Sequence, residues 1–251
     1  MTISTIDNSQ RTAAKVAGIA LVFSMVIVVF ANFALLNPLL VRGNAVETAR
    51  NILAHETQYR VAVILFLTYS LNVVILLAAL YVVLRPINHG LALAGALFRL
   101  VFAILWLLST LNLLGALRLL GSAPYLQAFE PERLQVLART YIAMTFDDYY
   151  VGLPFFGLAA TVCAWLWLKS GYIPRWLALF GVISSAWCVV CAFLFLIFPT
   201  FNKTINDWLF DSPMALFELV LGFWLLLKGL RPPGIAEPGS IKNLSKSGAA
   251  T

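Results

Sequence analysis

Six long apolar stretches constrain the fold of this chain more than any other feature of its sequence. They cover residues 16–41, 61–84, 91–117, 149–168, 176–198 and 213–230. A helix rises about 1.5 Å per residue, so about 20 residues cross a hydrocarbon core roughly 30 Å thick. Because lipid offers no partners for backbone N–H and C=O groups, such stretches cross a membrane as helices.

The composition agrees with a membrane protein. Hydrophobic residues make up 61% of the chain and charged residues 11%, and the mean hydropathy is +0.90, which excludes an ordinary soluble domain. The first stretch is too long for a cleaved signal peptide and lacks a convincing small-residue cleavage site, so we expect it to be retained. The sequence predicts an all-α integral membrane protein with a cytoplasmic segment over residues 1–12, a six-helix transmembrane bundle over 13–230 and a disordered cytoplasmic tail over 231–251.

Basic residues are distributed unevenly between the two sides of the predicted bundle. Six spans place both termini on one side, which holds nine Lys and Arg and two carboxylates, whereas the other side holds seven Lys and Arg and eight carboxylates. Cytoplasmic loops carry the excess of Lys and Arg, so we expect a multi-pass protein of the bacterial cytoplasmic (inner) membrane with both termini inside. The net charge of +6 then reflects topology, and its pattern does not indicate a nucleic-acid partner.

Two of the longer external links contain short amphipathic stretches. On a helix, the apolar residues of each stretch share one face: Val46, Ala49, Ile52 and Leu53 in the first, and Leu134, Leu137 and Tyr141 in the second. We expect short interfacial helices on the outer leaflet from this pattern.

Arg99 and Glu218 are the two charged residues that fall well inside the apolar stretches. A charge near the bilayer centre costs at least about 2.5 to 3.5 kcal/mol, so such residues tend to be paired or functional. We expect both to face the bundle interior and to interact directly or through water, beside a polar cavity to which Asn72 contributes. Side chains tilt toward the N-terminus of their own helix, which would move these two apart. The alternative is that Arg99 extends alone to the cytoplasmic interface and that Glu218 is a separate protonatable site.

A second group of polar residues is predicted on the external side. His55, Asp147 and Asp148 could form a cation or metal site there, with Asp207 and Asp211 nearby. Asp at the start of a helix also caps free amides and complements the helix dipole, and we favour this structural interpretation. The chain has two histidines, predicted on opposite faces of the membrane, which is too few for a haem or a zinc site. We therefore expect no metal and no other cofactor.

Several short motifs in three of the predicted spans point to a family. They are Phe98-Arg99 in the third span, Ile173-Pro174-Arg175-Trp176-Leu177 at the fifth, and Glu218 with Trp224 and Lys228-Gly229 in the sixth. Together they resemble the bacterial membrane proteins called the domain of unknown function 4386 family, from about Arg11 to Leu230. The resemblance implies a bundle of about six helices and no assigned reaction. Family members often have a Glu three residues after the third-span Arg, where this chain has Phe102, which implies that any activity of that Glu is lost or altered here.

Two classes of function fit these residues. The first is small-solute or ion transport, or ligand binding, in a polar cavity around Arg99, Glu218 and Asn72, with the lipid bilayer and an unknown small solute as partners. The second is a membrane-embedded enzyme or an accessory subunit acting at the external face through the polar group that contains His55. Missing catalytic motifs favour the first class. Association into a homo-oligomer is left open by the sequence.

Overall fold

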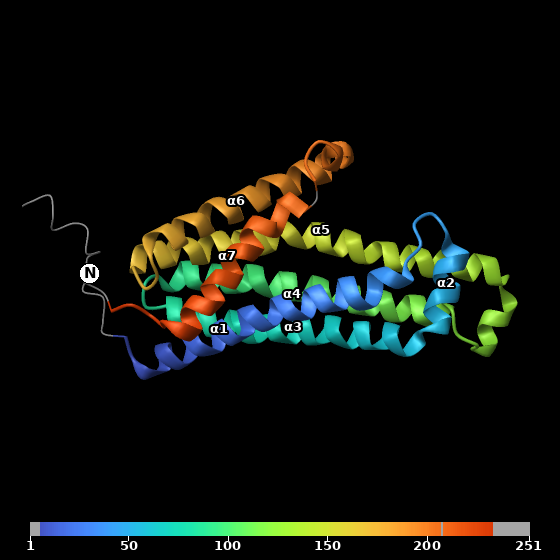
Figure 1. Cartoon of the computed structure of the whole chain (residues 1–251), viewed down its shortest axis with the longest axis horizontal. Coiled ribbons are helices and arrows are strands. Elements are labelled where there is room, and N and C mark those ends of the chain that lie inside the picture. Colours follow the sequence, from blue (N-terminus) through green and yellow to red (C-terminus); the bar gives the residue numbers. More distant parts are fainter. Residues whose placement is uncertain (1–5, 207, 233–251) are drawn as a thin grey trace, which may run out of the picture.

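The computed structural model describes residues 6–206 and 208–232, and these form a bundle of long helices (Figure 1). Within them, six segments are long and apolar enough to cross a membrane. Their principal helices are α1 (Asn8–Val29), α3 (Glu56–Leu84), α4 (His89–Leu119), α5 (Pro131–Ser170), α6 (Arg175–Ile197) and α7 (Trp208–Leu227). The predicted all-helical fold with six membrane spans is confirmed. The predicted tail lies outside the described residues from residue 233 onward.

The six long helices form a closed ring. Each packs chiefly against two others, in the order α1, α3, α4, α5, α6, α7 and back to α1. As a result, α4 and α7 lie on opposite sides of the ring and are not packed against each other along their length. The ring closes tightly where α1 meets α7, because a Cβ atom on Gly222 would lie 3.2 Å from Gly18 O and 3.0 Å from Val22 Cγ2. Small residues allow helix backbones to approach this closely in a membrane.

Both ends of the described chain lie at the same end of the ring, which we name the terminal end. Side-chain hydrogen bonds join three segments there: Gln10 Nε2 at the start of α1 donates to Val83 O near the end of α3 and to the hydroxyl of Tyr172 before α6. The opposite end is the distal end. The N-terminus and the red end of α7 share one side of the molecule in Figure 1.

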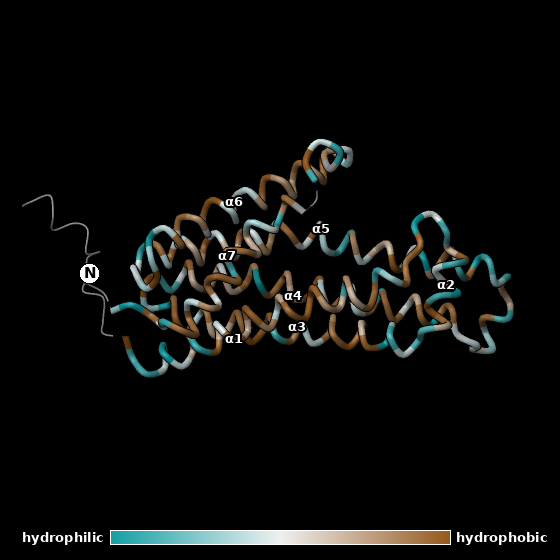
Figure 2. The backbone as a smooth tube through the Cα atoms, in the orientation of Figure 1, coloured by the Kyte–Doolittle hydropathy of each residue, from teal (hydrophilic) through white to brown (hydrophobic). Residues whose placement is uncertain are grey.

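The helices differ greatly in length, and the difference shapes the distal end. The 23 residues of α6 and the 20 of α7 span roughly 35 and 30 Å, whereas the 40 residues of α5 span roughly 60 Å. The distal parts of α3, α4 and α5 therefore extend past the α6–α7 hairpin, and the short helix α2 (Ala45–Ala54) lies beside them. Apolar residues dominate the section shared by all six helices, and polar residues concentrate at both ends (Figure 2).

The first span differs from a simple α-helix. After α1 ends at Val29, the chain continues as a π-helix over Phe30–Leu36 and a 3-10 helix over Asn37–Leu39. Asn32 Nδ2 donates to Val28 O at 2.9 Å, the carbonyl that the amide of Asn32 would use in an α-helix, and such competition disturbs the helix ladder. Pro38 then removes a backbone donor, which prevents a regular α-helix from continuing.

The two predicted amphipathic segments have different outcomes. The first forms α2, whose residues Ala49 and Ile52 are buried while Val46 and Leu53 are exposed. The second is not a separate helix, because residues 134–141 are the first part of α5. The burial of Ala138 along one face, followed by further buried residues at helical spacing, carries this helix directly into the membrane span.

A proline inside α7 is compensated by a side chain from α6. Pro213 has no N–H and cannot bond to the carbonyl of Leu209 four residues earlier. Trp187 Nε1 donates to Leu209 O at 2.8 Å instead. Since an unpaired carbonyl is costly in lipid, this bond lets α7 continue through Pro213.

Candidate functional site

Arg99 and Glu218 form a direct ion pair inside the ring. Arg99 Nη2 donates to Glu218 Oε1 at 2.6 Å, and the two side chains are 3% and 12% exposed. Arg99 belongs to α4 and Glu218 to α7, so the pair crosses the ring between opposite helices. The predicted direct interaction is therefore present in the structure. The length of the Arg side chain overcomes the opposing tilt of the two residues.

The ion pair lies at the boundary between two apolar clusters. On α3 the distal cluster ends at Val73 and the terminal cluster begins at Leu76, and on α7 the same boundary falls between Met214 and Phe217. The guanidinium carbon of Arg99 is 5.3 Å from the ring centroid of Phe156. Arg99 Nε is buried and has no hydrogen-bond partner among the described residues. The buried cation thus retains an unused donor, which is costly in apolar surroundings.

Buried aromatic side chains fill the bundle on the distal side of Arg99. Phe102 stacks on Phe156 with ring centroids 4.6 Å apart and an interplanar angle of 10°. Tyr69 packs on Trp106 with centroids 4.3 Å apart, and Phe66 lies 5.0 Å from the same Trp106 ring. We name these five residues the aromatic block. It separates the ion pair from the distal end.

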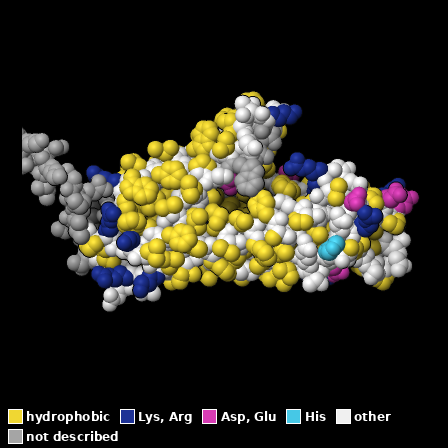
Figure 3. Space-filling view, viewed as in Figure 1, with side chains coloured by type: hydrophobic (Ala, Val, Ile, Leu, Met, Phe, Trp, Pro, Cys, Tyr) yellow, Lys and Arg dark blue, Asp and Glu magenta, His cyan; other side chains and the backbone are white. Residues whose placement is uncertain are grey.

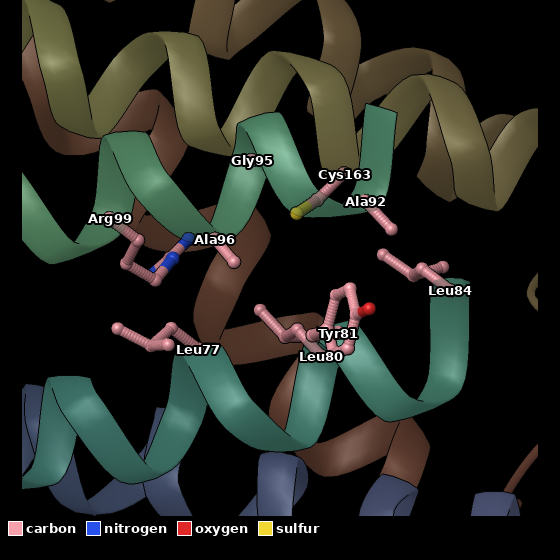
Figure 4. A pocket seen from close by; sticks show the side chains of 9 residues that line it. All are labelled: Leu77, Leu80, Tyr81, Leu84, Ala92, Gly95, Ala96, Arg99 and Cys163. Carbon is pink, nitrogen blue, oxygen red and sulfur yellow. The ribbon is translucent and has the colours of Figure 1, made fainter. Parts of the chain in front are cut away.

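A narrow crevice lies on the terminal side of Arg99, between α3 and α4. Figure 4 shows Arg99 and Leu77 at one end of the crevice and Leu84 and Ala92 at the other. Its remaining lining residues are Leu80, Tyr81, Gly95, Ala96 and Cys163. The empty space in the crevice is about 200 Å³ when the part at its open side is included. The crevice is nevertheless too narrow to admit a water molecule. The site is therefore closed in this conformation.

Asn72, the third residue predicted at this site, joins two helices instead. Its Nδ2 donates to Ala20 O at 2.8 Å and to Ser24 Oγ at 2.7 Å, both on α1. Among the described residues it makes no hydrogen bond to Arg99 or Glu218. Asn72 thus fixes α3 against α1, as polar side chains often do between membrane helices.

The polar residues that the sequence predicts on the external side are not gathered into one site. Asp148 Oδ2 accepts from Ser109 Oγ at 3.1 Å and from Asn112 Nδ2 at 2.8 Å, which ties α5 to α4. Asp147 is exposed, and His55 lies exposed at the junction of α2 and α3 with Nδ1 3.1 Å from Asn51 O. Across residues 6–206 and 208–232, no group of three His, Cys, Asp or Glu side chains could hold a metal ion.

The structure corrects the expected position of two of these acidic residues at a helix start, whereas Asp211 does lie in the first turn of α7. Asp147 and Asp148 lie in the middle of α5 and do not start a helix. Asp211 is the fourth residue of α7, and its Oδ2 accepts from the hydroxyl of Tyr149 at 2.6 Å. Asp207 lies outside the described residues. Asp148 and Asp211 join helices through hydrogen bonds, which the sequence could not show because the partners come from other helices.

Residues 16–229 match a protein family described as a domain of unknown function (DUF4386). The chain belongs to the DUF4386 family. An uncharacterised protein of Archaeoglobus fulgidus is 27% identical to this chain over 165 residues, which cover 66% of this chain and 81% of the relative. No solved structure matches the chain.

The DUF4386 match covers the helical ring from residue 16 in α1 to the end of α7, and it includes both members of the ion pair. Phe102, at the position where the resemblance implies a Glu in other members, belongs to the aromatic block beside Arg99. In this DUF4386 protein an apolar ring therefore occupies that place, and Glu218 supplies the carboxylate for Arg99.

Proposed function

We propose that this protein transports a small solute or ion, or binds such a ligand, at the Arg99–Glu218 pair. The observation that carries the proposal is the position of the pair, which crosses a closed ring of membrane helices between their two apolar clusters. Ionisable residues inside membrane segments are costly and commonly mark solute or ion pathways.

The surroundings of the pair suggest how such a site would work. The aromatic block closes the distal side of Arg99, and the crevice approaches it from the terminal side. A transporter exposes a central site alternately to its two sides by moving helices around it. We propose that the closed conformation described here opens first at the crevice, between α3 and α4.

We further propose that the protein resides in the bacterial cytoplasmic membrane with both termini inside. Lys and Arg cluster at the terminal end, whereas the distal end carries both signs of charge (Figure 3). The excess of Lys and Arg near one end is the basis of this orientation.

Solute uptake into proteoliposomes tests the transport proposal. Purified protein would be reconstituted and offered a panel of labelled small anions, cations and neutral metabolites. We expect uptake of at least one solute above protein-free vesicles, lost in the Arg99→Met/Glu218→Gln double variant.

The matched control is the Arg50→Met/Glu47→Gln double variant. It removes an ion pair of the same 2.6 Å length whose side chains are 74% and 42% exposed, and it should retain uptake. If no solute enters, and thermal shift detects no binding to the wild-type protein across the same panel, the proposal is wrong and an accessory role becomes the better explanation.

A further inference from the structure

Arg99 has hydrogen-bonding capacity that Glu218 does not use. A guanidinium carries five N–H donors in a fixed plane. Nη2 donates to Glu218 Oε1, whereas Nε has no partner although the side chain is 3% exposed. Phe156 lies near the guanidinium at 5.3 Å. A carboxylate is the ligand that matches two parallel donors along one edge of a guanidinium.

The unused donor of Arg99 indicates a class of substrate for the proposed transport or binding site, and the inference below rests on that proposed function. We propose that Arg99 binds a small monocarboxylate anion after Glu218 takes up a proton, so that one proton accompanies each anion. The proton comes from bulk water and forms an O–H bond on the carboxyl group of Glu218. No other bond forms or breaks except hydrogen bonds. Release of the anion returns the proton and restores the ion pair.

The balance of charge in the site selects a monovalent anion. The present pair is neutral because one positive and one negative charge cancel. A protonated Glu218, a positive Arg99 and a bound monocarboxylate are also neutral together. A dianion would leave an excess negative charge in apolar surroundings, and a neutral solute would leave Arg99 without a counterion, both at high cost.

The crevice selects a small ligand with an apolar part. Ala92, Gly95 and Ala96 form its α4 wall and leave only short side chains next to Arg99. The opposite wall carries Leu77 and Leu80 from α3, which must move because the crevice is too narrow for water. A short aliphatic monocarboxylate fits this lining better than a polar metabolite.

Few other ionisable groups face Glu218. Arg99 pairs with it from α4, and the other side chains that interact electrostatically with it are Tyr69 on α3, Cys163 on α5 and Cys188 on α6. On its own helix, Asp211 is held by Tyr149 toward the distal end. The ionisable side chains of α1 are Arg11 and Lys15, both within its first eight residues. Phenols and thiols are uncharged in neutral solution, so Glu218 is the group beside Arg99 that can exchange a proton.

Isothermal titration calorimetry on the full chain in detergent tests the inference. The probes are sodium propionate and its neutral isostere propionamide, each titrated at pH 5.5 and 7.5 in two buffers of different ionisation enthalpy. We expect propionate to bind with uptake of about one proton and with a Kd that rises up to about tenfold per pH unit. Propionamide should not bind.

Three variants separate the roles of the two residues. Glu218→Gln should bind propionate more tightly than wild type, without proton uptake and without pH dependence. Arg99→Lys should weaken binding about tenfold, because an ammonium lacks the paired donors of a guanidinium. The Arg99→Met/Glu218→Gln variant, which leaves no unpaired charge and is expected to fold, should not bind.

The outcomes distinguish this inference from the proposed function. Propionate binding without proton uptake, or binding retained in the double variant, would overturn the inference. If uptake measurements reveal a neutral or cationic substrate that depends on the ion pair, the inference fails and the proposed function stands. If no solute binds and none is transported, both are wrong.

Discussion

Removing one member of the Arg99–Glu218 pair should destabilise the protein far more than removing both. Arg99 Nη2 and Glu218 Oε1 are 2.6 Å apart. At an effective dielectric constant of about 20, the Coulomb attraction between the two charges is about 6 kcal/mol. Taking two charges out of water costs several kcal/mol for each ion, so the net contribution of a buried pair is close to zero. Loss of one partner leaves the other charge uncompensated at a cost of about 3 to 5 kcal/mol.

The two single changes should not be equivalent. Glu218→Gln leaves Arg99 charged, because a guanidinium does not lose its proton in proteins. Arg99→Met leaves a carboxyl group, which can become neutral by taking up a proton. At low pH Glu218 is protonated in both the folded and the unfolded Arg99→Met variant, so the cost of this change should fall as the pH is lowered. The Glu218→Gln variant has no titrating carboxyl group at this position, so its own stability should lack this pH dependence.

Thermal unfolding in detergent measures these differences. A loss of 1 kcal/mol lowers the Tm of a protein of this size by roughly 2 to 4 °C, so each single change should lower it by about 10 °C at pH 8. The double variant should unfold within about 2 °C of wild type, as should Arg50→Met and Glu47→Gln, since exposed pairs contribute about 0 to 1 kcal/mol. If the losses of the two single changes at Arg99 and Glu218 simply add in the double variant, the two residues are not energetically coupled and the reasoning is refuted.

Three further predictions concern the ring and its orientation. Trp187→Phe should lower the free energy of unfolding by about 1 to 2 kcal/mol, because it leaves a backbone carbonyl unpaired. The loss should be smaller in a Pro213→Ala background, where the restored amide can bond to that carbonyl. Equal losses in both backgrounds would contradict the role assigned to Trp187. Asn72→Leu should lower the Tm by a few degrees through the loss of two hydrogen bonds without changing propionate binding, and an altered Kd would place Asn72 in the ligand site. Reporter fusions at Glu130 should read external and a fusion after Lys246 should read internal, whereas an external signal after Lys246 would refute the proposed orientation.

The sequence was sufficient for the architecture because the lipid environment leaves few choices. Long apolar stretches must form helices in a membrane, and all six predicted spans correspond to helical segments of the structure. The ends of these helices were harder to predict. The apolar run in the sequence ends near the edge of the bilayer, whereas α5 begins 18 residues before Tyr149. One face of this distal part, at Ala138, Ile142 and Thr145, is buried against the rest of the protein.

The ion pair was predictable for a similar reason, since unpaired charges are expensive in lipid. Arg99 and Glu218 stood out against apolar surroundings, and their approximate depths allowed contact. The partners of Asn72 and Asp148 were not predictable, because hydrogen bonds between helices depend on rotation about the helix axes. Trp187 was missed because the sixth span was predicted to begin at residue 213, whereas α7 begins at Trp208 and contains Pro213, so the carbonyl of Leu209 needs another donor.

The separation of 119 residues between Arg99 and Glu218 also has a consequence for synthesis and insertion of the chain. At about 5 to 20 residues per second, translation needs roughly 6 to 24 seconds to produce Glu218 after Arg99 has been made. During this interval the third span holds a cation without its carboxylate, and the ring lacks its closing helix. A truncated or stalled chain without α7 keeps Arg99 unpaired in the membrane. We infer that this unpaired charge distinguishes an incomplete chain from a complete one for membrane proteases. The last helix, α7, thus supplies the carboxylate that neutralises Arg99 of the third span, which is synthesised much earlier.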